Sequence, residues 1–139
     1  MSKFQLFDYA GWGEFAATEV HMSQSVRVGD RIEISGQGKF GILNTLEVPC
    51  ANQRLQAQIE NAFANVDLAL KNAGASKGVG QAYKVVSYHC PLGEKTTELM
   101  VKAFRKHFPD HRPLWTEIGV AKLGLPDMKV EIEVVAVAD

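Results

Sequence analysis

The residues best suited to chemistry are acidic and lie in the C-terminal stretch 112–139, RPLWTEIGVAKLGLPDMKVEIEVVAVAD. Glu131 and Glu133 alternate there with apolar residues, and Trp115 and Glu117 alternate in the same way before a Gly-Leu-Pro-Asp turn. A carboxyl group with a raised pKa beside an ionised carboxylate can give and take a proton, which is general acid–base chemistry. An indole can form a flat wall for an apolar or aromatic ligand, or it can stack on a cation.

These residues also have purely structural explanations. Glu117 and Glu131 can form an interfacial pair bonded to hydroxyl groups or backbone, and for Glu117 we favour that explanation. Trp115 can fill an interface instead of facing a ligand. His89 and Cys90 are adjacent on a predicted strand and therefore point to opposite faces, so a Cys–His nucleophile pair is not expected. The other histidines show no metal-ligand spacing, so the sequence predicts no metal site.

The composition limits the class of protein. A chain of 139 residues with 46% hydrophobic residues has the length and apolar mass of a single domain, 1–139. Its net charge of −1 and the lack of a basic stripe argue against nucleic acid as a partner. No apolar run approaches the roughly 20 residues of a membrane span. Two cysteines are too few for a disulfide framework, so we expect a cytoplasmic protein and leave a mitochondrial location open.

The hydrophobic pattern predicts five strands and two helices. Strands alternate in a hairpin at 25–37, which turns at Gly29 and Asp30 and is followed by a glycine-containing loop at 38–49. Apolar residues recur at helical spacing in two segments, and β-branched or aromatic residues mark three further strands. The predicted helices are 51–73 and 94–108, and the further strands are 80–90, 114–121 and 128–138.

This order of elements predicts an α+β fold with both helices on one face of a mixed sheet. Each strand–helix–strand unit that joins parallel strands is expected to be right-handed. The other face of the sheet has no helix to cover it, and we expect Trp115, Glu117, Glu131 and Glu133 to share that face. An exposed tryptophan among β-branched residues is typical of an interface or a pocket, so we expect the chain to associate with itself.

Three segments of this sequence resemble the Rid family, also called the YjgF or endoribonuclease L-PSP family. They are SQSVRVGDRIEISGQ, the long helix that ends in NAGAS, and the closing GLPDMKVEIEVVAVAD. The resemblance runs from about Met22 to the C-terminus. It implies a chorismate-mutase-like α+β fold, assembled as a homotrimer with clefts between the subunits. It also implies, for the best-known branch, the hydrolysis of enamines and imines such as 2-aminoacrylate without metal or cofactor.

The site of that branch matches this sequence only in part. Ser35, Gly36 and Gln37 fit its SGQ motif, and Glu131 fits the glutamate of its last strand. The small Ser35 has an alternative explanation, since a compact residue also suits the passage from strand to loop.

Three other positions depart from the pattern. Met22 stands where the family has a tyrosine, Trp115 where it has the arginine that grips the substrate carboxylate, and Glu117 where it has a cysteine. Arg112 is a poor substitute, because an odd offset on a strand points it to the other face. Arg31 is another conceivable donor. An added carboxylate makes the pocket more negative, so an anionic ligand would be repelled.

We therefore expect a divergent Rid-family homotrimer that takes a neutral, aromatic or cationic small molecule in its clefts. The reaction would be hydrolytic deamination of an enamine or imine, or a related proton transfer, by Glu131 with Ser35. The expected substrate-binding residues are Met22, Gly36, Gln37, Tyr88, His89, Trp115 and Glu117. The alternative is a non-enzymatic trimer that binds a metabolite or has a regulatory role, and an endoribonuclease is a third, less favoured hypothesis.

Overall fold

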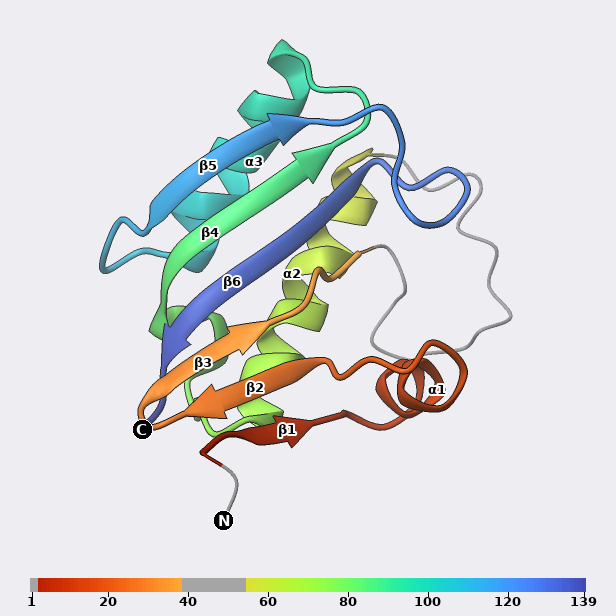
Figure 1. The fold of residues 1–139 in the computed structure, drawn as a ribbon. Helices are drawn as coiled ribbons and strands as arrows, with labels where there is room; N and C mark the ends of the chain where they lie inside the picture. The colour runs from red at the N-terminus through yellow and green to blue at the C-terminus, as the bar shows by residue number, and fades with distance from the viewer. Residues whose placement is uncertain (1–2, 39–54) are drawn as a thin grey trace.

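The computed structural model describes residues 3–38 and 55–139, which form a six-stranded sheet and three α-helices (Figure 1). The strands are β1 Gln5–Phe7, β2 Ser25–Val28, β3 Arg31–Ile34, β4 Ala82–His89, β5 Leu114–Gly119 and β6 Val130–Val137. The helices are α1 Trp12–Glu19, α2 Leu55–Asn72 and α3 Glu94–His107, and a 3₁₀ turn, η2 Gly78–Gln81, precedes β4. No helix in the described ranges is long and apolar enough to cross a membrane.

The sheet is mixed, and its strand order is β1-β2-β3-β6-β4-β5. All neighbouring strands are antiparallel except β4 and β5, which are parallel and are joined through α3. Strands β3 and β4 are each antiparallel to β6, so they are parallel to one another, and α2 lies between them in the chain. The fold therefore contains two strand–helix–strand units with the last strand, β6, inserted near the middle of the sheet.

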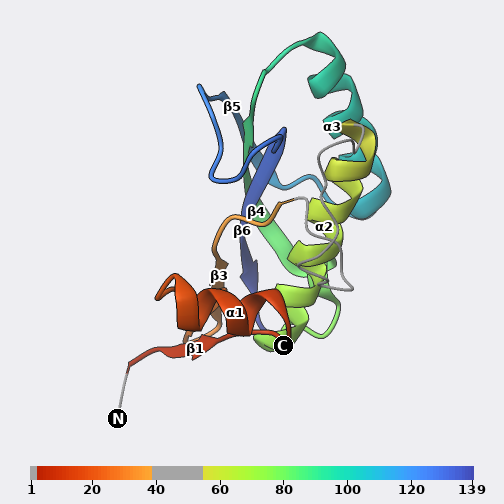
Figure 2. The ribbon, with the colours of Figure 1, turned by 90° about the vertical axis from the view of Figure 1, so that its right-hand side faces the viewer.

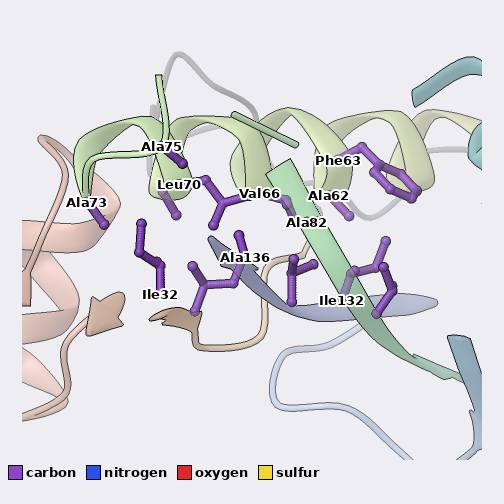
Figure 3. Packing of buried hydrophobic residues seen from close by; sticks show 14 of the residues in the cluster. Ile32, Ala62, Phe63, Val66, Leu70, Ala73, Ala75, Ala82, Ile132 and Ala136 are labelled. Atoms are coloured by element: carbon purple, nitrogen blue, oxygen red, sulfur yellow. The ribbon is translucent and has the colours of Figure 1, made fainter. Parts of the chain in front are cut away.

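Helices α2 and α3 cover the same face of the sheet, as Figure 2 shows from the side. Apolar side chains of α2 pack on β3, β4 and β6, with Phe63, Val66 and Leu70 of the helix facing Ile32 and Ile132 of the sheet (Figure 3). All five of these side chains are 0% exposed. Complete burial of each such side chain contributes about 1.5–3 kcal/mol, so this layer is the main source of stability.

The expected elements are confirmed, and two elements were missed. The hairpin, both helices, the three later strands and the placement of both helices on one face agree with the sequence prediction. The short strand β1 and the helix α1 were not predicted, because neither carries a sustained apolar period. The predicted start of the first helix, 51–54, and nearly all of the predicted loop at 38–49 lie outside the described residues.

We call the face of the sheet opposite α2 and α3 the uncovered face, and it is turned towards the viewer in Figure 1. Its strand residues follow from the pairing register, and several of the apolar ones are well exposed, Leu114 at 67% and Val137 at 48%. The side chains that define it are Leu6, Val26, Val28, Arg31, Glu33, Lys84, Val86, Tyr88, Leu114, Thr116, Ile118, Glu131, Glu133, Val135 and Val137.

The prediction that Trp115 and Glu117 share this face with Glu131 and Glu133 is wrong. Trp115 is paired with Val85, and Val85 is paired with Val134 of the core, so all three point towards the helices. The physical reason is that β4 lies between β5 and β6. Alternation separates the residues of each strand into two sets, but only the pairing through β4 decides which set of β5 matches which set of β6.

Candidate functional site on the uncovered face

A hollow of about 630 Å³ opens beside β2 and β3, at the end of α1. Met22, Ser35 and Glu33 line it, together with apolar side chains that include Leu6 and Val26. Met22 and Ser35, which lie on separate segments, are thus brought together as the resemblance implies. A site of this size with mixed apolar and hydroxyl lining suits a small organic ligand.

Glu131 lies directly against the residue that follows Ser35. A methyl group placed on Gly36 would collide with the Glu131 carboxyl group, so glycine is needed there for the carboxyl group to lie so close to the chain. Burial raises the pKa of Glu131, and the charge of Glu133 raises it further. A half-buried carboxyl group whose pKa is raised, next to the residue that follows Ser35, has the properties of a group that donates and accepts protons.

Gln37 holds this region together and does not line the hollow. Its backbone forms a two-way bridge with Ile132, with N···O distances of 2.8 and 2.9 Å, which fixes the SGQ segment beside β6. Its side-chain amide donates to the Ser35 carbonyl and to Gln24 Oε1, both at 3.0 Å, and its oxygen accepts a hydrogen bond from the Tyr9 hydroxyl at 2.7 Å. The contacts of Gln37 therefore indicate that it positions Ser35.

Sequence reasoning missed three residues that support Ser35. Tyr9 and Gln24 are buried, and burial raises the pKa of the Tyr9 hydroxyl, which stays a hydrogen-bond donor to Gln37. The Ser35 hydroxyl donates to the Gln24 carbonyl at 3.2 Å, while the Gln24 backbone N–H donates to Asp8 at 3.0 Å. Asp8 and Tyr9 come from the N-terminal segment, which has no motif or period that would have indicated this role.

Tyr88 lies on the uncovered face opposite Glu131, and its hydroxyl donates a hydrogen bond to Glu133 Oε1 at 2.8 Å. The predicted placement of Tyr88 near Glu131 is therefore consistent with the structure. Arg31 cannot replace a missing arginine beside Glu131: it pairs with Glu33 at 2.8 Å and lies opposite Val137, six residues along β6. At about 3.3 Å per residue, that is a separation of about 20 Å.

His89, Trp115 and Glu117 belong to a polar cluster on the helix-covered side, under α3. The Ser87 hydroxyl accepts a hydrogen bond from Trp115 Nε1 at 2.9 Å and lies 2.8 Å from His89 Nε2, while the Glu117 carboxylate accepts one from the Thr97 hydroxyl at 2.5 Å. The expectation that His89 faces the same cleft as Glu131 is not met within one chain, because His89 is 0% exposed on the opposite face.

Trp115 is held in this cluster by aromatic packing. Its ring centroid is 4.5 Å from that of Phe104 on α3. Contacts of this kind contribute about 0.5–1.5 kcal/mol beyond the burial of area. The contacts of Trp115 within one chain are therefore those of a residue that fastens α3 to the edge strand β5.

Among the residues that the structure describes, no three histidine, cysteine, aspartate or glutamate side chains are grouped as the ligands of a metal ion would be. The acidic residues of the site instead occur as Glu131 and Glu133 on one strand. The chemistry that this arrangement supports is proton transfer by a carboxyl group.

We predict that Trp115→Arg will destabilise the protein and will not create a carboxylate-binding site. The change removes the contact with Phe104 and the bond to Ser87, and it places a guanidinium under α3. A loss of about 1–3 kcal/mol in the free energy of unfolding is expected, because the ring contact and the hydrogen bond to Ser87 are both removed, measured by urea denaturation. Trp115→Phe, which keeps the ring contact, is the control and should lose clearly less. Unchanged stability together with tighter binding of a small carboxylate would contradict the observed orientation.

We also predict that stability falls as the pH is lowered from 7 towards 5, with His89 contributing to the slope. Burial lowers the pKa of His89 below its ordinary value, with the charge of Glu117 acting in the opposite sense. The unfolded chain, whose histidines titrate near 6.5, then binds more protons than the folded chain in this window, so protonation favours unfolding by up to about 1.4 kcal/mol per pH unit. Burial lowers the pKa of His107 as well, so the wild-type slope contains both residues.

The measurement is the pH dependence of urea unfolding for His89→Gln beside the wild type. Glu131 acts in the opposite direction, because a raised carboxyl pKa adds stability as the pH falls, but it is present in both proteins and does not affect the comparison. His21→Gln, which changes an exposed histidine, is the matched control. A His89→Gln slope equal to that of the wild type and of His21→Gln would show that His89 titrates normally.

Comparisons with known proteins identify the family and the fold. The family model described as endoribonuclease L-PSP matches residues 14–138. No curated protein matches the chain.

Solved structures show the same fold. The YjgF gene product of E. coli is 28% identical, with a TM-score of 0.70 over 85% of this chain and 88% of that one. Protein YjgH is 26% identical, with a TM-score of 0.78 over 99% and 98%. A YjgF/YER057c/UK114 family protein from Mycobacterium tuberculosis is 21% identical, with a TM-score of 0.75 over 97% and 99%. The chain belongs to the YjgF/YER057c/UK114 (Rid), or endoribonuclease L-PSP, family.

Proposed function

We propose that this protein is a cofactor-free hydrolase of small imines or enamines that carry no carboxylate, with Glu131 as the group that moves protons. The observation that supports this most directly is the half-buried Glu131 carboxyl group, whose pKa is raised by burial and by Glu133. It lies against Gly36, the residue after Ser35, and Ser35 lines the hollow. Membership of the Rid family makes this chemistry the natural expectation.

The proposed reaction converts an imine and water into a carbonyl compound and ammonia. Protonated Glu131 gives its proton to the imine nitrogen, and the water that attacks the imine carbon returns a proton to Glu131. A second proton from Glu131 then makes the amine a leaving group. As ammonia departs, the proton of the new hydroxyl group passes back to Glu131, so the carboxyl group ends as it began. The Ser35 hydroxyl, held by Gln24 and Gln37, is placed to hold the ligand or the water.

The charge of the site argues for a substrate without a carboxylate. Glu131 and Glu133 both lie on the uncovered face, while Glu33, which lines the hollow, is paired with Arg31 and adds little net charge. The indole at position 115 is fastened under α3, so no guanidinium stands there to bind an anion. An imine becomes a cation when it is protonated, and neighbouring carboxylates stabilise that cation while they repel an anionic ligand.

Self-association is the second part of the proposal. The uncovered face carries exposed leucine, isoleucine and valine side chains beside charged ones. A patch of this kind commonly marks an interface between proteins. A homotrimer, as the family resemblance implies, would cover this face and would close the hollow from the outside.

We predict that the wild-type protein has a mass in solution three times the 15.3 kDa of the chain, measured by light scattering. Val135→Asp places a carboxylate at the centre of the uncovered face, between Glu33 and Lys84 in the register, and should dissociate the assembly. Val20→Asp, at an exposed valine after α1, should not. A monomeric wild type, or a Val135→Asp protein with unchanged mass, would contradict the proposed interface.

The activity is tested with two imines generated in situ, one from benzylamine by an amine oxidase and the other 2-aminoacrylate. After subtraction of the spontaneous rate, kcat/KM for ammonia release should be higher for the imine without a carboxylate than for 2-aminoacrylate. Glu131→Gln should lose about 100-fold or more, since general acid–base groups contribute about 10²–10⁴-fold. Glu19→Gln, a change at the exposed end of α1, is the control.

The opposite results separate the other hypotheses. Faster turnover of 2-aminoacrylate would overturn the proposed substrate class, and full activity of Glu131→Gln would overturn the role of Glu131. No turnover of either imine by a trimeric protein would favour the metabolite-binding hypothesis, which a thermal-shift screen then addresses, because a ligand that binds only the folded state raises the melting temperature. Salt-sensitive cleavage of RNA would favour the endoribonuclease hypothesis.

A further inference from the structure

Three side chains on neighbouring strands form an asymmetric arrangement around the proposed acid. Glu131 and Glu133 are two residues apart on β6 and point to the same face, at a spacing of about 7 Å along the strand. Tyr88 lies directly opposite Glu131 in the register, yet its hydroxyl donates to Glu133 Oε1 at 2.8 Å. The tyrosine thus bonds diagonally to one carboxylate and leaves the other one free of that bond.

Such a bond makes two chemically identical groups different. Two carboxylates that lie close together resist ionising at once, so one of them tends to keep a proton. A hydrogen bond donated to one carboxylate stabilises its charged form. Glu133 receives that bond, so the proton that the pair retains is directed to Glu131. Glu131 also lies against Gly36 and is half-buried.

The other groups around Glu131 do not cancel this bias. From the β3 side, Gly36 and Gln37 face it and carry no charge. Along β6, Lys129 lies two residues from Glu131 on the side away from Glu133. On β4, Tyr88 lies opposite Glu131, and Cys90 is two residues further along the chain. Lys84 and the Arg31–Glu33 pair lie further along, beside Val135 and Val137. Burial and the charge of Glu133 are the dominant influences on the pKa of Glu131, and both raise it.

We propose that Tyr88 is a positioning residue that fixes Glu133 as the charged member of the pair, so that Glu131 is the member that carries and delivers the proton. This inference rests on the proposed function and refines its substrate class. A ligand that takes a proton from Glu131 becomes a cation beside the fixed negative charge of Glu133. The preferred ligand is therefore a weakly basic nitrogen compound that is neutral when it binds, such as an imine without other charged groups.

Tyr88 is suited to act as the hydrogen-bond donor to Glu133. The bond to Glu133, partial burial and the charges of Glu133 and Glu131 all raise the pKa of the Tyr88 hydroxyl. It therefore keeps its hydrogen and remains a donor across the range in which the carboxyl groups titrate. Phenylalanine at this position would fill the same space on the sheet and remove only the donor, which makes Tyr88→Phe a clean test.

The test is an NMR titration of the full-length protein labelled with ¹³C at the glutamate carboxyl carbons, with signals assigned through Glu131→Gln and Glu133→Gln. In the wild type, Glu131 should titrate above the ordinary range of a glutamate, because burial and the charge of Glu133 raise its pKa. In Tyr88→Phe, the Glu131 curve should broaden towards lower pH, because the Glu133 charge beside it is no longer held by the bond from Tyr88, while burial of Glu131 is unchanged. Glu133→Gln should lower the midpoint of Glu131. Tyr83→Phe, at an exposed tyrosine on the same strand, should leave the Glu131 curve as in the wild type.

This readout needs no turnover, so it separates the inference from the proposed function. Titration curves of Tyr88→Phe identical to those of the wild type would overturn the positioning role, whatever the activity. If the curves change as expected and the benzylamine-derived imine is turned over, the alkaline limb of the kcat/KM profile, along which Glu131 loses its proton, should broaden in Tyr88→Phe and stay unchanged in Tyr83→Phe. If the curves change and no imine is hydrolysed, the positioning role of Tyr88 is supported and the proposed hydrolase activity is contradicted.

Discussion

Strand β6 is the element on which both the core and the candidate site depend. Its pairing with β3 and β4 directs Val130, Ile132 and Val134 into the core, at no more than 2% exposure, and Glu131 and Glu133 to the opposite face. A slip of one residue would exchange the two sets. The slip would bury two carboxylates without partners, and each would lower the stability by roughly several kcal/mol. The acidic residues proposed for chemistry therefore also help to fix the register of the strand that carries them.

Elements with strong local signals could be predicted from the sequence. The apolar stripe of α2 and the turn at Gly29, whose φ of 61° suits glycine, are local features that need no knowledge of the rest of the chain. Strand β1 spans three residues and α1 eight, too short for a period to be recognised. Their positions depend on long-range bonds, such as Tyr9 to Gln37 and Gln24 to Asp8, which no local pattern reveals.

The candidate site was predictable to a similar degree. Ser35, Gly36 and Glu131 come together because the SGQ segment is bridged to β6, as the resemblance implies. The orientation of Trp115 was not predictable, since it depends on how β4 pairs with both of its neighbours. Once β5 lies beside β4 in the observed register, the indole meets Phe104 and Ser87. The tryptophan then stabilises the packing of α3.

The proposed assembly and the proposed acid are physically coupled. If another subunit covers the uncovered face, water is removed from Glu131, Glu133 and Tyr88 together. Desolvation favours the neutral form of a carboxyl group, while a hydrogen bond to a charged group strengthens as the local dielectric constant falls. Both effects act in the same direction here, because Glu133 holds the bond from Tyr88 and Glu131 does not. Covering the face would therefore widen the difference between the two carboxyl groups, so that the contact that stabilises the oligomer would also prepare Glu131 to donate its proton.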